Sequence, residues 1–70
     1  MKFVYMNAHR DAVDNAIKHL DSIYGLCYSW ANETRRWDQE FGLQICRTKL
    51  GDSIMFQNEQ EYLIWLLRFS

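Results

Sequence analysis

The hydrophobic residues of this chain recur with two periods, one typical of helices and the other typical of strands. Over residues 8–24 the period is helical. Apolar side chains return every three or four positions and form one stripe, made of Val13, Ala16, Ile17, Leu20, Ile23 and Tyr24. Asn7 stands where an N-cap is expected, and Gly25 stands where a left-handed residue ends a helix. The spacing therefore predicts a helix over residues 8–24.

Four other segments have the composition or the alternation of strands. Residues 2–6, KFVYM, are β-branched and aromatic, and residues 26–31, LCYSWA, place large side chains at every second position. Residues 41–48, FGLQICRT, are followed after a short KLGD link by residues 53–56, SIMF. Because the glycine in that link suits a tight reversal, the last two segments predict a hairpin over residues 41–56.

The segment SWANETRRWDQEF, residues 29–41, fits two structures. In a strand, Trp37 and Phe41 keep the phase of the apolar residues that follow them, so the third strand begins early. In a helix, Ser29 is the N-cap, Gly42 ends the helix, and one side is made of Trp30, Thr34, Trp37 and Phe41. We favour the strand, which gives the element order β-α-β-β-β-α. The helix gives β-α-α-β-β-α.

Either order makes a single compact α+β domain of residues 1–70. We expect a small antiparallel-rich sheet of three or four strands with two helices packed on one face. A chain of this length buries only about 60% of the surface that its unfolded form exposes. Its core is therefore small, and association with another chain is a usual source of additional stability.

The last helix is expected to follow Asn58, with Glu61 completing a capping box, and it is apolar on almost every side. A helix that is apolar all round is buried all round. One sheet face and one neighbouring helix cannot cover so much apolar surface. The excess predicts an interface with a protein partner or with a second copy of the chain, through Leu63, Ile64, Leu67 and Arg68.

A second candidate for partner binding lies within residues 29–41 and consists of Trp30, Arg35, Arg36 and Trp37. Tryptophan and arginine are enriched at interface hot spots because one supplies area and the other supplies planar donors. The same residues also suit a scaffold. In that case the tryptophans turn into the core, and Arg35 and Arg36 form an exposed tip.

The charge balance argues against a nucleic-acid partner, since the net charge is −1 and the pI is about 6.0. Nucleic-acid-binding domains usually carry a clear basic patch. The alternative that remains is a patch made by Arg35, Arg36, Arg47 and Lys49, if the hairpin brings them to one side.

Enzymatic and metal-binding motifs are absent from the sequence, which has no glycine-rich phosphate loop, no G-x-S-x-G and no H-E-x-x-H. His9 and His19 stand ten positions apart and point in different directions on one helix, so neither a metal nor a cofactor is expected. A chain this short also leaves little room for a pocket of about 300 Å³ or more. We therefore expect a non-enzymatic protein.

No secretory signal and no membrane-spanning stretch is visible, so we expect a cytoplasmic protein that does not enter membranes. Cys27 and Cys46 have matching parity on the expected strands, which makes a disulfide conceivable, but free thiols are expected in a reducing compartment.

In size and in its richness in Trp, Tyr, Cys and Met, the chain resembles small phage-encoded accessory proteins, some of which inhibit host enzymes or defence complexes. The resemblance implies a protein-binding module that acts by occluding a surface of a host factor. A purely structural homodimeric subunit is the other alternative.

Overall fold

The computed structural model describes all of residues 1–70. Its elements, in chain order, are the strand β1 (Lys2–Tyr5), a short 3₁₀ helix η1 (Met6–His9), α1 (Arg10–Tyr24), α2 (Trp30–Phe41), β2 (Gln44–Thr48), β3 (Gly51–Phe56) and α3 (Glu59–Phe69). The expected α+β fold class is confirmed. The element order is that of the helical alternative, with one strand fewer and one helix more than the favoured order.

The strand interpretation of residues 29–41 is wrong, because both ends of α2 carry helix-terminating groups. The side chain of Ser29 accepts a hydrogen bond from the backbone N–H of Asn32 at 3.2 Å. At the other end Gly42 is left-handed, with φ 66°, and its N–H donates to the carbonyl of Asp38. These caps satisfy backbone groups that a strand would have left to a neighbour. Residues 25–29, part of which was expected to be a strand, form a loop without regular structure.

The observed ends of the other helices agree in part with those predicted from the sequence. Gly25 ends α1 with φ 83°, as expected. Asn7 is not the N-cap of that helix, because a 3₁₀ turn comes first and α1 begins at Arg10. The expected start of α3 is confirmed, since the side chain of Asn58 accepts from the N–H of Glu61 at 2.9 Å.

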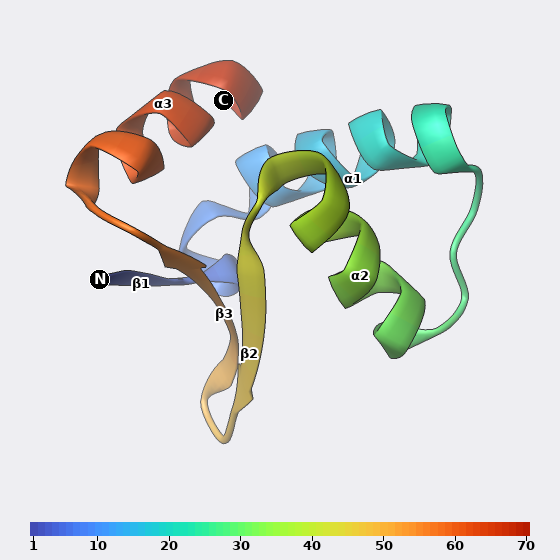
Figure 1. The fold of residues 1–70 in the computed structure, drawn as a ribbon. Helices are drawn as coiled ribbons and strands as arrows, with labels where there is room; N and C mark the ends of the chain where they lie inside the picture. Colours follow the sequence, from blue (N-terminus) through green and yellow to red (C-terminus); the bar gives the residue numbers. More distant parts are fainter.

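The sheet has the order β1-β3-β2, and both strand pairs are antiparallel. Ile54 of the central strand lies between Val4 of β1 and Ile45 of β2. The predicted hairpin is present as β2 and β3, but it begins at Gln44 and not at Phe41, which belongs to α2. The first strand of the chain pairs with a strand some fifty residues later. α1 and α2 lie on one side of the sheet (Figure 1). After β3 the chain continues into α3.

The core lies between one face of the sheet and the three α-helices. Val4, Ile54 and Phe56 come from the strands, and they pack with the buried apolar residues of the helices, which are Ala12, Val13, Ala16, Leu20, Trp37, Trp65 and Phe69. α1 packs against both α2 and α3. The accessible surface of the chain, 4905 Å², is close to the about 4,650 Å² expected of a compact 8.5 kDa monomer. The protomer is therefore compact and not extended.

Candidate functional site

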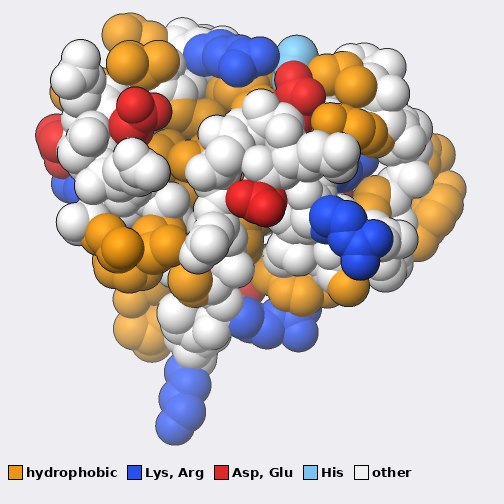
Figure 2. Space-filling model, viewed as in Figure 1, with side chains coloured by type: hydrophobic (Ala, Val, Ile, Leu, Met, Phe, Trp, Pro, Cys, Tyr) orange, Lys and Arg blue, Asp and Glu red, His pale blue; other side chains and the backbone are white.

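The helix α3 has one buried side and one apolar side that no other element covers. Trp65 and Phe69 are buried in the core. On the outer side the exposed fractions are 47% for Leu63, 54% for Ile64 and 81% for Leu67. We call these three residues the α3 stripe. Hydrophobic side chains are visible over α3 along the upper edge of the molecule (Figure 2). The predicted excess of apolar surface on this helix is therefore present in the folded chain.

One flank of the α3 stripe carries opposite charges. Glu61 and Arg68 line a small cavity of about 140 Å³ with Ile64, beside the C-terminal end of α2. The guanidinium of Arg68 lies 4.9 Å from the ring centre of Phe69 and 3.3 Å from Nε2 of His19. Arg68 is therefore positioned by its neighbours while its side chain stays exposed.

Trp37, predicted as a contact residue, is a core residue, so its place in a partner-binding surface is a correction. It is fully buried, and its indole Nε1–H donates to the carboxylate of Glu33 at 3.0 Å. Trp30 is half-buried at the other end of α2, where the guanidinium of Arg47 lies 4.5 Å from its ring centre. A spacing of seven residues puts the two tryptophans on the same side of α2 but two turns apart. They do not form one exposed surface, because Trp37 lies in the core while Trp30 sits at the helix start.

Arg36 is not an exposed tip, which is a second correction. It is only 6% exposed, and its Nη2 donates to Asp21 at 2.7 Å while its Nη1 donates to the carbonyl of Gly25 at 3.0 Å. Its Nε also lies 2.8 Å from Glu33. Burial by itself lowers the pKa of Arg36, but the bonds to Asp21 and Glu33 outweigh burial and raise the pKa above its ordinary value. Arg36 therefore stays charged and ties α2 to the end of α1.

The four cations of the nucleic-acid alternative do not assemble into one patch. Arg36 is buried among carboxylates, and Arg47 is stacked on Trp30 and lies 3.9 Å from Asp52. Arg35 is exposed beside β2, and Lys49 occupies the turn of the hairpin. Since the charges are dispersed or neutralised, this arrangement lacks the basic stripe that phosphate binding requires.

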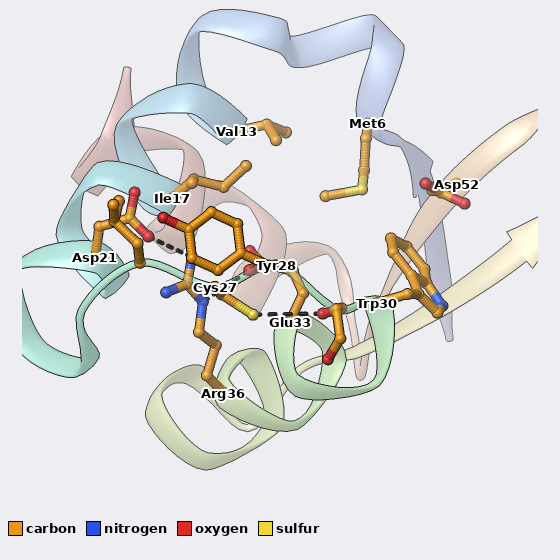
Figure 3. Close-up of a pocket in the computed structure, with 12 residues that line it drawn as sticks. Met6, Val13, Ile17, Asp21, Cys27, Tyr28, Trp30, Glu33, Arg36 and Asp52 are labelled. Atoms are coloured by element: carbon orange, nitrogen blue, oxygen red, sulfur yellow. Dashed lines mark hydrogen bonds and ion pairs between the residues drawn. The ribbon is translucent and has the colours of Figure 1, made fainter.

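A groove of about 550 Å³ separates α1 from the start of α2, although so large a hollow was not expected in a chain of this length. Met6, Val13 and Ile17 lie along one side, and Trp30 lies at the other (Figure 3). Three of the four charged groups that line it are engaged with one another, because Arg36 of α2 binds both Asp21 of α1 and Glu33 of α2. The groove therefore presents mainly apolar walls.

The sequence interpretation missed a further apolar surface, on the sheet face that points away from the helices. Phe3 faces Met55 across the β1–β3 pair, and Tyr5 faces Ser53. Phe3 and Tyr5 are both exposed, because the buried residues of the helices all pack against the opposite face. The sequence carried a signal for this surface. In KFVYM, apolar residues occur in both alternating sets of side chains, a pattern typical of strands covered on two sides.

Both cysteines are free thiols, with Cys27 in the loop before α2 and Cys46 on β2. No group of three or more His, Cys, Asp or Glu residues lies close enough together to hold a metal ion. None of the helices combines the length and the apolar character needed to cross a membrane.

No family model, no curated protein and no solved structure matches this chain.

Proposed function

We propose that this chain is a small, non-enzymatic protein-binding module and that the α3 stripe is its main contact surface. The observation that carries the proposal is the exposure of Leu63, Ile64 and Leu67 on one side of a helix whose other side is core. Three neighbouring aliphatic side chains form the kind of contiguous apolar patch that marks an interaction site on a small protein.

The stripe supports binding by desolvation. Removing a fully exposed leucine or isoleucine side chain from water contributes about 1.5–3 kcal/mol. Leu67 gains the most on binding, because Leu63 and Ile64 are already about half covered within the protomer. Gln60, Glu61 and Arg68 surround the stripe, and a polar rim of this kind fixes the register of an apolar contact. The module acts by covering a surface of its partner, which is the mode of action of an occluding inhibitor.

A matched pair of leucine substitutions tests the proposal. Leu67→Glu places a charge in the stripe, whereas Leu50→Glu places the same charge at a leucine of the hairpin turn, also highly exposed at 78%. In pull-downs from a lysate, a specific partner should be retained by the wild type and by Leu50→Glu and lost with Leu67→Glu. Equal retention by both variants would show that the stripe is not the contact surface.

Association with a second copy would use the same stripe, and a structural homodimer therefore differs from the leading proposal only in its partner.

A further inference from the structure

The charged flank of α3 consists of Glu61 and Arg68, which have opposite charges, so the two ends of the α3 stripe are not equivalent. A helix has about 3.6 residues per turn, so Glu61 and Arg68, which are seven residues apart, lie on the same side of α3. Both lie beside Ile64, one towards each end of the stripe. Glu61 forms no ion pair within the chain, although its flank borders Glu40 and Phe41 at the end of α2. α3 itself occupies an outer edge of the fold (Figure 1).

A twofold interface brings each patch against its own copy. In an antiparallel pair of α3 helices, the flank that carries Glu61 and Arg68 faces the same flank of the other helix in reverse order. Glu61 of each copy then lies opposite Arg68 of the other. In a parallel pair the two acidic first turns, with Glu59 and Glu61, come together instead. Charge complementarity therefore selects the antiparallel arrangement.

We propose that α3 pairs with α3 of a second copy in an antiparallel dimer, with the α3 stripes in the seam and two reciprocal Glu61–Arg68 ion pairs at its side. The inference rests on the proposed function, since the second copy occupies the proposed binding surface.

The size of the contact sets its strength. α3 has 11 residues and is about 16 Å long, and a stable interface usually buries about 800 Å² on each partner. Three aliphatic side chains and their rim cover less than that. The dimer is therefore weak and dependent on concentration, and it should be measured by sedimentation from about 10 µM to about 1 mM.

Charge reversal tests the pairing. Glu61→Arg leaves α3 with two basic side chains on this flank, and Arg68→Glu leaves it with two acidic ones. Each variant alone should therefore dimerise at least about tenfold more weakly than the wild type. An equimolar mixture of the two should recover dimers, because unlike flanks then meet. Asp38→Arg and Arg35→Glu make the same charge changes on the exposed side of α2 and should leave dimerisation unchanged. Far-UV circular dichroism confirms that each variant is folded.

A cross-linking experiment avoids any substitution of Arg68. In a background with Cys27→Ser and Cys46→Ser, Ile64→Cys lies near the twofold axis and should form a disulfide-linked dimer. Gln60→Cys lies about 13 Å from its counterpart in the antiparallel arrangement, beyond the reach of a disulfide. A parallel pair would link both variants.

Three results would overturn the dimer: a wild type that stays monomeric to about 1 mM, a mixture no more dimeric than its components, or equal cross-linking of both cysteine variants. A monomeric wild type whose partner capture is still lost with Leu67→Glu would overturn the dimer alone and leave the proposed function standing.

Discussion

The guanidinium of Arg36 on α2 lies 2.7 Å from the carboxylate of Asp21 on α1. This ion pair joins the two helices that the loop of residues 25–29 connects, and the bond from Arg36 to the carbonyl of Gly25 fixes the start of that loop. Glu33, one turn earlier on α2, contacts the same guanidinium. Arg36 therefore has partners on both helices and on the loop, whereas Arg35 beside it in the sequence is exposed.

Arg36→Ala should lower the free energy of unfolding by about 1.5–3 kcal/mol, because the substitution removes charge-assisted bonds and leaves two carboxylates without their cation. Arg35→Ala is the matched control and should change it by no more than about 0.5 kcal/mol. Urea unfolding followed by circular dichroism measures both values. Equal effects of the two substitutions would contradict the assigned role of Arg36.

The two buried tryptophans should respond differently to replacement by phenylalanine. The N–H of Trp37 donates to Glu33, whereas the buried N–H of Trp65 meets no acceptor in the chain. Trp37→Phe loses a bond to a charged group, while Trp65→Phe removes an unsatisfied donor. We expect Trp37→Phe to be more destabilising by at least about 1.5 kcal/mol in urea unfolding. The reverse order would show that ring packing, and not the polar atom, decides the cost.

Gly42 should resist replacement for a reason confined to the backbone. Its φ is 66°, and a Cβ added there would meet no atom within 4 Å. Gly42→Ala should cost about 1–2 kcal/mol through left-handed strain alone. Gly42→Asn should cost less, because asparagine tolerates this conformation better. Thermal unfolding of the two variants gives the comparison, and equal losses would argue against the left-handed cap.

Tyr24 should bind its proton more tightly in the folded state than in the unfolded state. Burial first, and then donation of its hydroxyl to Glu40 at 3.2 Å, raise the pKa of Tyr24 above its ordinary value. The contribution of Tyr24 to the free energy of unfolding is fully present below the pKa of about 10 in the unfolded chain. It is lost as the pH rises through the pKa of Tyr24 in the folded chain. Glu40→Gln should lower the Tyr24 pKa. The tyrosinate absorbance, taken as the difference from Tyr24→Phe in each background, measures the shift, and an unchanged pKa would contradict the contact.

The apolar excess of the last helix was predictable because it depends on composition alone. An 11-residue helix can turn only one side towards its own core, so Leu63 and Leu67 had to lie outside whichever elements packed against Trp65. The exposed sheet face could also have been predicted from KFVYM, because Phe3 and Tyr5 alternate with the buried Val4 and so lie on the other face.

The sequence by itself determined the α+β class, the hairpin, α1 with its glycine end, and the capped start of α3. These features depend on local periodicity and on groups that cap nearby backbone, so they could be predicted without knowing which distant residues pack against them. Only the tertiary structure decided that residues 30–41 are helical and that Arg36 is buried. The phase of Trp37 and Phe41 suits a strand as well as a helix, so the local pattern left both structures open. The burial of Arg36 depends on Asp21, a residue of another helix that meets Arg36 only when the chain is folded.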